Sequence, residues 1–400
     1  MKNINIFALA AHGEGISGGD RIFIELARNW SKDCQVKLFV TDEGYRMCLR
    51  HKLERSNVQF QISNIKKWAK YGFVINYIAR IIEGLRLGFT LKLENNSETL
   101  VYSASEFWMD SLSAFLLKLR HPVIKWIAAW YQTAPNPLIG FNEGGRKNKY
   151  YISAFFYFLA QLPIKPLINK YADLILVNNI LETNEFSSLK SHQKVMVFLG
   201  AVDLDQINKY RKEFKGTPKK YDGVFQGRFH PQKGVVELID IWKKVVKKKP
   251  DALLAMIGDG PLMESVKLKV KTEKLEENIK LFGYLFDGPE KYRIFAQSKV
   301  VLHPSFFDSG GMASAEAMAF GLPCVGFDLP AFEDYYPQGM IKTKKGDLED
   351  FSQNILNLLS NTALYEKISQ DALKMIQNGW SWELRASQVL NKLDHKLPIK

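Results

Sequence analysis

Residues 299–327 have the sequence KVVLHPSFFDSGGMASAEAMAFGLPCVGF. The two ends of this stretch, KVVLHPS and LPCVGF, are short and apolar, which is typical of strands buried on both faces of a sheet. Residues 313–320 between them are rich in Ala, Met and Glu, which favour a helix. A strand, a helix and a second strand in this order predict a βαβ unit, and therefore a parallel sheet.

The same alternation extends in both directions along the chain. In the second half, further strands are expected at YDGVFQGR (221–228), ALLAMIG (252–258), IKLFGY (279–284) and GMIKT (339–343), with helices near 234–248, 261–271, 288–297, 348–376 and 380–395. In the first half, strands are expected at INIFALAA (4–11), VKLFVT (36–41), TLVYSA (99–104), VIKWIAAW (123–130) and DLILVN (173–178), with helices over 19–31 and 109–120. This pattern predicts an α/β chain with two doubly wound, Rossmann-like domains.

The domain boundary is expected in a polar, Lys-rich linker. This linker covers residues 203–221, so that residues 1–204 form the first domain and residues 205–379 the second. In open α/β sheets, ligands bind at the carboxyl ends of the strands. The two domains are therefore expected to face each other across a ligand-binding cleft.

Composition supports a folded chain of this size. The chain has 400 residues, of which 46% are hydrophobic and 24% charged. No segment approaches the ~20 consecutive apolar residues that span a bilayer, and the apolar start MKNINIFALAAHG is interpreted as a buried strand instead of a signal peptide because its apolar run is short. The cysteines Cys34, Cys48 and Cys324 are odd in number and widely spaced, which predicts buried thiols in a reducing cytoplasm and neither a disulfide nor a zinc site.

The chain is basic, with a formal net charge of +13. Most of the surplus lies in residues 1–200, which hold 25 Lys and Arg against 16 Asp and Glu. Such a balance favours anionic partners, whether phosphates, an acidic membrane surface or nucleic acid, although a basic surface without a specific partner explains it too. No nucleic-acid-binding motif accompanies the charge, so nucleic acid is not expected as a partner.

Two Gly-rich segments follow expected strands and precede expected helices. Glycines let backbone N–H groups approach a phosphate, and the start of a helix adds positive potential. The first segment, HGEGISGG (12–19), is a weak signal because its spacing is not that of a dinucleotide fingerprint. The second, GRFHPQKG (227–234), places Arg228 and Lys233 at one turn, where a guanidinium fork and a mobile ammonium suit a diphosphate.

The most specific pattern lies in the stretch 299–327. Asp308 is expected in a loop, and Glu316 about one turn into the following helix. Gly310 and Gly311 between them would present backbone N–H groups to an anion at the helix start. Glu316 lies in the otherwise apolar run AEAMAF and needs a polar partner there. A ribose diol would supply two hydroxyl donors, whereas the alternative is a structural Glu with partners in the protein.

These motifs together resemble glycosyltransferase family 4, a retaining family of GT-B fold. The resemblance rests on GR-x(4)-KG (227–234) and on an acid, seven residues and Glu316, followed by AMAxGxP (317–323). Further matching segments are ADLILVN (172–178), LGAVD (199–203), IGDGP (257–261), FGY (282–284) and WSWE (380–383). The resemblance is specific over residues 221–385 and loose in the first half. It implies that a terminal helix over residues 380–400 returns to the first domain.

The resemblance implies a role for each matching residue. Arg228 and Lys233 would bind the donor diphosphate and stabilise the leaving phosphate, Asp308 would hold a sugar hydroxyl, and Glu316 would hold the ribose. The remaining donor-binding positions implied by the match are Gly18, Gly19, Gly258, Tyr284, Ser309, Gly310, Gly311 and Met312. Members of the family need no metal or other cofactor, because basic residues offset the charge of the departing diphosphate.

The chain departs from the family pattern in two places. The first acid is usually Glu and here is Asp308, which is one methylene shorter, so the donor sugar is left open. Many members carry a His after the strand that corresponds to residues 123–130, where this chain has Trp130, Tyr131 and Gln132. Gln132, Glu106 and His12 are therefore the candidates for the acceptor side.

Asp203, Leu204 and Asp205 spell the metal-binding DxD motif of another glycosyltransferase fold. We reject this reading because the motif lies in the segment that matches the family's entry to the linker. Neither HExxH, CxxC nor clustered His ligands occur in the sequence. No metal site is expected.

The aromatic stretch YYISAFFYFLAQL (150–162) allows two interpretations. A helix that is apolar on all sides is normally buried in a core, and this is the expected arrangement. The alternative is a partly exposed face that rests on a membrane or a lipid-linked acceptor. Basic flanking residues would favour an anionic interface, namely Arg146, Lys147, Lys149, Lys165 and Lys170.

The sequence thus predicts a retaining hexosyltransferase that uses a UDP- or GDP-sugar as donor. A glycan or a polyprenyl-diphosphate-linked glycan is the expected acceptor, as in the synthesis of bacterial surface polysaccharides, and the inner face of the cytoplasmic membrane is the expected location. Two alternatives are a non-catalytic nucleotide- or glycan-binding protein of the same fold and a sugar-nucleotide 2-epimerase.

Overall fold

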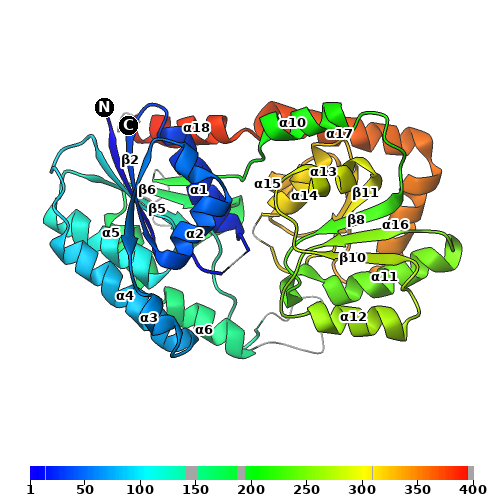
Figure 1. The fold of residues 1–400 in the computed structure, drawn as a ribbon, viewed down its shortest axis with the longest axis horizontal. Coiled ribbons are helices and arrows are strands. Elements are labelled where there is room, and N and C mark those ends of the chain that lie inside the picture. Colours follow the sequence, from blue (N-terminus) through cyan, green and yellow to red (C-terminus); the bar gives the residue numbers. More distant parts are fainter. Residues whose placement is uncertain (14, 141–150, 187–193, 309, 395–400) are drawn as a thin grey trace. The chain divides into compact units, whose positions relative to one another are not determined.

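The structure is a computed structural model, and it describes residues 1–13, 15–140, 151–186, 194–308 and 310–394. The chain divides into two compact units. Their described residues are 1–140 and 151–200 with the terminal segment from residue 382 in the first unit, and 201–381 in the second. Two parallel α/β units confirm the predicted pair of Rossmann-like domains (Figure 1).

The first unit contains a seven-stranded parallel sheet with the strand order β3-β2-β1-β4-β5-β6-β7. Its strands are β1 (Asn3–Ala8), β2 (Gln35–Thr41), β3 (Val58–Ser63), β4 (Thr99–Ser103), β5 (Lys125–Trp130), β6 (Leu174–Val177) and β7 (Val195–Val197). Its helices are α1 (Gly18–Trp30), α2 (Asp42–Arg50), α3 (Lys66–Ala69), α4 (Phe73–Thr90), α5 (Trp108–Arg120), α6 (Tyr151–Gln161), α7 (Ile164–Tyr171), α8 (Ile180–Thr183) and α18 (Trp382–Asp394). Helices α1, α2 and α18 lie on one side of this sheet, and α4 and α5 on the other (Figure 1).

The second unit contains a six-stranded parallel sheet with the order β10-β9-β8-β11-β12-β13. Its strands are β8 (Tyr221–Gln226), β9 (Leu254–Ile257), β10 (Ile279–Gly283), β11 (Ser298–His303), β12 (Cys324–Phe327) and β13 (Met340–Thr343). Its helices are α10 (Leu204–Glu213), α11 (Val235–Lys248), α12 (Met263–Thr272), α13 (Pro289–Ala296), α14 (Met312–Met318), α15 (Phe332–Tyr335), α16 (Leu348–Ser360) and α17 (Thr362–Gly379).

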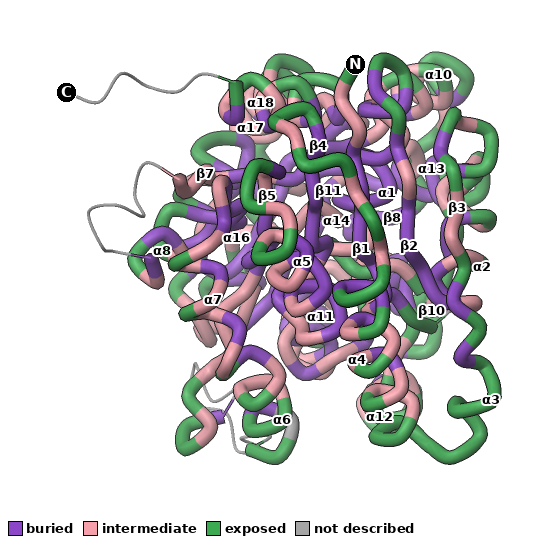
Figure 2. The backbone as a smooth tube through the Cα atoms, turned by 90° about the vertical axis from the view of Figure 1, so that its left-hand side faces the viewer, coloured by how far each residue is buried: buried purple, intermediate pink, exposed green. Residues whose placement is uncertain are grey.

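The central strands of both sheets are buried on both faces, as their continuous apolar sequences predict. Residues 4–8 of β1 are all buried, and the central strands of both sheets are drawn as buried in Figure 2. The apolar start of the chain is therefore a central strand, as predicted. Cys34, Cys48 and Cys324 are buried free thiols, which also agrees with the prediction.

The strand order reverses once in each sheet, and this positions the candidate site. In the first unit, β1 has β2 on one side and β4 on the other; in the second, β8 has β9 on one side and β11 on the other. Connections leave such a pair of strands in opposite directions and open a crevice at their carboxyl ends, where ligands of doubly wound sheets bind. The predicted segments 12–19 and 227–234 follow β1 and β8, and Asp308 follows β11.

Several expected elements differ from the structure. The stretch 203–221, predicted as a linker, contains helix α10, which Asp203 caps by accepting a hydrogen bond from the N–H of Gln206 at 3.0 Å. The helix predicted over 348–376 is two helices, because Asn361 ends α16 in an extended conformation and caps α17. Strands β3 and β7 and helices α2 and α4 were not among the elements assigned from the sequence.

Candidate active site

Lys233 and Asp308 meet at the carboxyl edge of the second sheet. Lys233 ends the short turn that follows β8, and its Nζ forms an ion pair with Oδ2 of Asp308 in the loop after β11. His303, the last residue of β11, places Nε2 3.2 Å from the same oxygen. The hydroxyl of Ser305 donates to it at 3.4 Å. The sequence predicted the first two residues but not the role of His303, whose only signal was its position at a strand end.

The charges of this cluster follow from burial and pairing. Burial alone would raise the pKa of Asp308, but the positive charge of Lys233 and the hydrogen bond from His303 outweigh it and hold the pKa well below its usual range. Burial lowers the pKa of His303, against the opposing effect of Asp308. At neutral pH the cluster thus holds an ionised carboxylate beside a neutral imidazole, which donates from Nε2 to Asp308 and accepts from the Ser314 hydroxyl at Nδ1.

The glycines after Asp308 allow the chain to pass close to His303. Gly311 has φ +120°, and a Cβ there would lie 2.7 Å from Cε1 of His303, so no other residue fits without displacement. The N–H of Gly310 donates to Oδ1 of Asp308 at 3.3 Å. In this structure the anion that faces this N–H is Asp308 itself, and a role of the N–H toward a ligand stays a prediction. Met312 begins α14, and Ser309 lies outside the described residues.

Glu316 is buried and has partners in the protein. Its Oε2 accepts hydrogen bonds from Nζ of Lys291 at 2.8 Å and from Nε2 of Gln226 at 2.9 Å. Lys291 is only 1% exposed and also pairs with Asp287. Because these side chains already supply the donors that a buried carboxylate needs, the burial of Glu316 does not by itself require a ribose. Lys291 could not be recognised from the sequence, since it lies in the ordinary amphipathic helix α13.

Arg228, Gly258 and Tyr284 lie in turns at the same edge of the sheet. Arg228 is exposed, in the turn after β8. Gly258 has φ +145°, and a Cβ there would lie 1.9 Å from the carbonyl oxygen of Gly227, so it lets the turns after β8 and β9 touch. Tyr284 follows β10, is 37% exposed and packs edge-on against Phe286 at 5.0 Å between ring centres.

In the first unit, Gly18 and Gly19 form the first turn of α1. The side chain of Ser17 caps this helix by accepting from the N–H of Asp20 at 3.1 Å. Gly18 is exposed and Gly19 is half-buried; a Cβ on Gly19 would lie 3.5 Å from the ring of Tyr131. His12 is exposed, and its Nδ1 lies 3.0 Å from the carbonyl oxygen of Ala10.

Glu106 and Gln132 are brought together by α6. The hydroxyl oxygen of Tyr157 lies 3.0 Å from Oε1 of Glu106 and 3.0 Å from the carbonyl oxygen of Gln132, so its single proton can be donated to either. Nε2 of Gln161 donates to the same carbonyl at 2.7 Å and lies 3.4 Å from Oε1 of Glu106. Burial raises the pKa of Glu106 to about 7 in spite of these hydrogen bonds. The sequence predicted the first pair of residues but missed Tyr157 and Gln161.

Two buried side chains, Asp110 and Arg80, form hydrogen bonds to the loops that follow β1 and β4. Oδ1 of Asp110 accepts from the N–H of Leu9 at 2.7 Å, and Oδ2 accepts from the hydroxyl of Ser105 at 2.5 Å. Arg80 of α4 donates to the carbonyl oxygens of Leu9 and Ala11 at 2.6 and 2.9 Å. Burial raises the pKa of Asp110 to about 7. Asp110 and Arg80 were not singled out from the sequence. Their hydrogen bonds stabilise the backbone next to His12 and Glu106.

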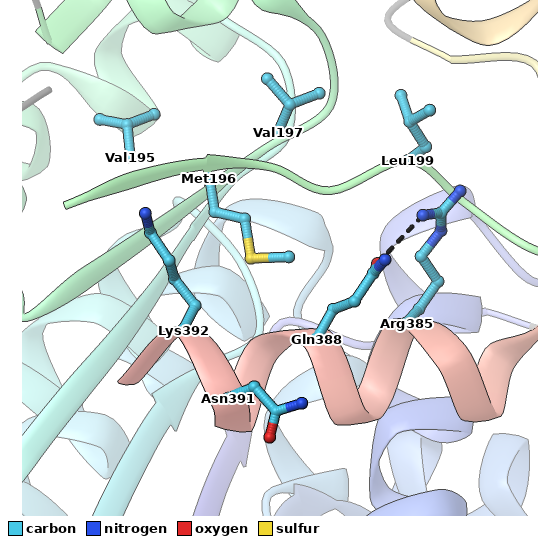
Figure 3. Close-up of a pocket in the computed structure, with 8 residues that line it drawn as sticks. All are labelled: Val195, Met196, Val197, Leu199, Arg385, Gln388, Asn391 and Lys392. Carbon is cyan, nitrogen blue, oxygen red and sulfur yellow. Dashed lines mark hydrogen bonds between the residues drawn. The ribbon is translucent and has the colours of Figure 1, made fainter. Parts of the chain in front are cut away.

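A groove of about 640 Å³ lies elsewhere in the first unit, between β7 and α18 (Figure 3). Val195, Met196 and Val197 line it from the strand, and Arg385, Gln388 and Lys392 from the helix (Figure 3). Nη1 of Arg385 donates to Oε1 of Gln388 at 3.1 Å across one turn of α18. None of the predicted site residues lines this groove, so it is separate from the candidate site.

Part of the chain matches a known protein family. Residues 206–375 match the family described as "Glycosyl transferases group 1". This range contains Arg228, Lys233, Asp308 and Glu316 and all six strands of the second sheet. The similarity to this family therefore lies within the second unit.

Curated relatives share part of the chain. The poly(glycerol-phosphate) alpha-glucosyltransferase of Bacillus subtilis (strain 168) is 26% identical over 166 residues, which cover 40% of this chain and 24% of the relative. The phosphatidyl-myo-inositol mannosyltransferase of Mycobacterium leprae (strain TN) is 24% identical over 296 residues, which cover 72% of this chain and 76% of the relative. The matches to the first three curated relatives span between 24% and 46% of their own lengths.

Solved structures share the whole fold. Anabaena Alr3699/HepE, in a crystal structure of its complex with UDP-glucose, matches with a TM-score of 0.70 and 14% identity. The match covers 98% of this chain and 100% of that one. At this level of identity the likeness confirms the predicted GT-B fold and nothing finer.

Proposed function

We propose that the protein is a retaining glycosyltransferase that moves a hexose from UDP or GDP to a glycan or lipid-linked acceptor. The observation that carries the proposal is the cluster of Lys233, Asp308 and His303 at the reversal of strand order in the second sheet. This cluster lies within the segment that matches glycosyl transferases group 1. The relatives named above act on poly(glycerol-phosphate) and on phosphatidyl-myo-inositol by name, which supports an acceptor that is a polymer or a lipid.

Each residue of the cluster has a chemical task in such a reaction. The ammonium of Lys233 is held at the carboxyl edge of the sheet, where a donor diphosphate would bring two negative charges. As the bond between the anomeric carbon and the phosphate oxygen breaks, negative charge grows on the diphosphate, and a positioned cation such as Lys233 or Arg228 stabilises it. The proposed reaction is metal-independent, because these two cations would offset the charge of the departing diphosphate.

Asp308 and His303 would hold the sugar. Asp308 is ionised and accepts hydrogen bonds, so a hydroxyl of the hexose could donate to it. A hydrogen bond from Nε2 of His303 holds this carboxylate in place, and a hydrogen bond from the Ser314 hydroxyl to Nδ1 holds the imidazole. The shorter side chain of Asp, compared with the Glu usual in the family, leaves one methylene more space for the sugar.

Glu106 is the proposed acceptor-side group of the first unit. Its pKa of about 7 lets the carboxyl exchange a proton near neutral pH. Tyr157 and Gln161 hold it beside the backbone of Gln132 at the carboxyl edge of the first sheet. An acceptor hydroxyl bound there could donate a hydrogen bond to the ionised form of Glu106.

The test is a nucleotide-release assay with a panel of UDP- and GDP-hexoses, preceded by thermal shift with the same compounds. A donor raises the melting temperature because it binds only the folded chain. Release of nucleotide that depends on added acceptor glycan supports the proposal, and NMR of the product establishes whether the anomeric configuration is retained. Binding without release would indicate a binding protein, and a sugar changed at C2 would indicate an epimerase; either result overturns the proposal.

A further inference from the structure

Helix α4 is apolar on two faces, and only one of them is packed. Its inner face lies against α5, and Gly84 and Gly88 allow the close approach: a Cβ on Gly84 would lie 2.3 Å from the carbonyl oxygen of Met109. Its outer face carries Ile75, Ile78, Ile82 and Phe89 at helical spacing, of which Ile82 and Phe89 are both 61% exposed. A helix that is apolar on both faces normally has protein or lipid on both. The outer face of α4 therefore lacks a partner within the described part of the chain.

Helix α6 presents a second face of this kind. Tyr157 and Gln161 point inward to Glu106, whereas Ile152, Phe155 and Phe156 are 74%, 48% and 60% exposed. The prediction that the aromatic stretch is buried core is wrong for these three side chains, because Tyr157 and Gln161 turn the polar side of the helix toward the protein. Tyr150 and the basic residues Arg146, Lys147 and Lys149 lie outside the described residues.

The exposed side chains are accompanied by positive charge. Lys66, Lys67 and Lys70 flank or lie in α3 and are all exposed, and no Asp or Glu occurs between residues 55 and 82. The ammonium of Lys67 lies 5.3 Å from the ring of Trp68, and that of Lys70 lies 4.9 Å from the ring of Tyr71. Trp and Tyr with Lys beside an apolar helix are the side chains that settle at the level of lipid headgroups.

These helices lie at one end of the first unit. Figure 1 and Figure 2 both place α3, the adjoining start of α4 and α6 toward the same end, and Figure 2 shows α3 and much of α6 as exposed. The ring of Phe73 at the start of α4 lies 6.4 Å from that of His12, and α6 holds Glu106. Helices α4 and α6 thus each contact a residue that is expected to meet the acceptor.

We propose that this surface, formed by the exposed side chains of α3, α4 and α6, binds the headgroup region of an anionic phospholipid bilayer. A bilayer fits better than a protein partner, because exposed aromatics and aliphatics on two helices are combined with exposed lysines. The nearest carboxylates are already engaged: Asp42 accepts from the backbone N–H groups of Ile65 and Lys66, and Glu83 pairs with Arg86. The inference deepens the proposed function and rests on it in one respect: a protein bound this way holds its acceptor side at the membrane, where a lipid-linked acceptor resides. Among the described residues no helix is both long and apolar enough to cross a bilayer, so the contact is with the surface.

Vesicle co-sedimentation of the full chain tests the proposal without any donor or acceptor. We expect binding to vesicles of an equal mixture of phosphatidylcholine and phosphatidylglycerol, and much weaker binding to phosphatidylcholine alone. The triple variant K66Q/K67Q/K70Q should weaken binding to the mixed vesicles by about 100-fold, and raised salt should do the same. The double variant I78Q/I82Q should weaken it by about tenfold or more without changing the charge.

Matched variants control for surface change in general. Leu119 and Leu268 are exposed apolar residues elsewhere, so L119Q/L268Q matches the isoleucine pair, and K212Q/K215Q/K247Q matches the lysine set. Both control variants should bind as the parent does. Equal binding to both kinds of vesicle, no binding, or equal losses in the control variants would overturn the proposal. A dimer in analytical ultracentrifugation that I78Q/I82Q dissociates, without vesicle binding, would assign the surface to a second copy and also overturn it.

The result can be separated from the fate of the proposed activity. Donor binding by thermal shift is measured in the absence of vesicles and involves the second unit. Donor binding with no vesicle binding overturns the membrane surface alone. Vesicle binding by a chain that binds no nucleotide sugar supports the surface and counts against the glycosyltransferase.

Discussion

Lys233 forms an ion pair with Asp308, so the cation proposed to bind the donor diphosphate contacts the carboxylate proposed to bind the donor sugar. The two groups come from different loops, after β8 and after β11, and their contact joins these loops at the carboxyl edge of the sheet. A diphosphate would compete with Asp308 for the ammonium of Lys233. Release of Asp308 would then leave its carboxylate available to a sugar hydroxyl, which couples binding of the two parts of the donor.

Replacement of Lys233 tests the catalytic part of this relationship. Lys233→Ala should lower turnover by ~100-fold or more, because a preorganised charge at the leaving group is lost. Nucleotide release measured at saturating donor reports the change. Lys244→Ala, which removes an exposed lysine paired with Glu349, is the control and should have parental turnover. Turnover of Lys233→Ala within a few-fold of the parent would exclude Lys233 from the mechanism.

Glu316 should affect donor binding and not folding. Glu316→Ala leaves Lys291 paired with Asp287, so the buried ammonium keeps one carboxylate partner. We expect the affinity for the donor nucleotide to fall by about tenfold or more, as is usual when a hydrogen bond to a charged group is lost. Isothermal titration calorimetry with UDP and GDP measures the affinity. Unchanged affinity in the variant would show that Glu316 is a structural partner of Lys291 only.

Replacement of Lys291 should instead lower the stability of the fold. Lys291→Met leaves Asp287 and Glu316 in place without their shared cation, and breaking a buried ion pair in this way costs about 3–5 kcal/mol. Urea unfolding followed by circular dichroism measures the loss of stability. The matched change Lys244→Met breaks the exposed pair with Glu349 and should cost at most about 1 kcal/mol. Similar stabilities of the two variants would contradict the importance of the buried pair.

The raised pKa of Glu106 predicts a pH dependence of stability. Burial raises this pKa from 4.5 to about 7, so between these values the folded chain holds a proton that the unfolded chain has released. The contribution of Glu106 is therefore fully present below pH 4.5 and is lost as the pH rises through 7. Glu106→Gln, which cannot ionise, should gain on the parent by about 3 kcal/mol between pH 5 and pH 8.

Calorimetry of parent and Glu106→Gln at several pH values checks this sign. The variant keeps an oxygen that accepts from Tyr157 and Gln161, so its packing should be preserved. A constant difference in melting temperature across the pH range would show that Glu106 titrates normally in the folded chain. Asp110, which is also buried with a pKa raised to about 7, contributes equally to both proteins and cancels in the comparison.

Metal removal tests the proposed chemistry from another side. If Arg228 and Lys233 alone offset the charge of the departing diphosphate, dialysis against EDTA should leave nucleotide release within a few-fold of its initial rate. The assay is repeated with added Mg²⁺ or Mn²⁺. Loss of activity on dialysis and recovery with either ion would overturn the metal-independent mechanism.

The sequence predicted what depends on local pattern. Apolar runs located the central strands, because a strand buried on both faces needs no alternation of polar and apolar residues. It missed β3, in which buried and exposed residues are mixed as is normal at the edge of a sheet, and β7, which is only three residues long. Helix α10 was taken for a linker because it is highly charged and buries only Ile207.

The residues of the candidate site also fall into those that could be predicted from the sequence and those that could not. Arg228, Lys233, Asp308 and Glu316 were predictable because each lies in a motif with fixed spacing. Lys291 and Gln226 were not, since their contact with Glu316 joins residues 25 and 90 positions away along the chain. The aromatic helix α6 was misassigned for a related reason: its periodicity is apolar on all sides, and only the position of Glu106 decides which side faces the protein.

Helix α18 has a consequence for how the chain is made. It packs on α1, and the indole N–H of Trp30 donates to the carbonyl oxygen of Ala386 at 3.0 Å, although 356 positions separate the two residues. During synthesis on the ribosome, the first unit emerges long before this helix, and the face of α1 that α18 will cover stays open while the second unit is translated. Folding of the first unit is therefore completed last, and truncation just before residue 382 should expose a face of α1 to chaperones and aggregation.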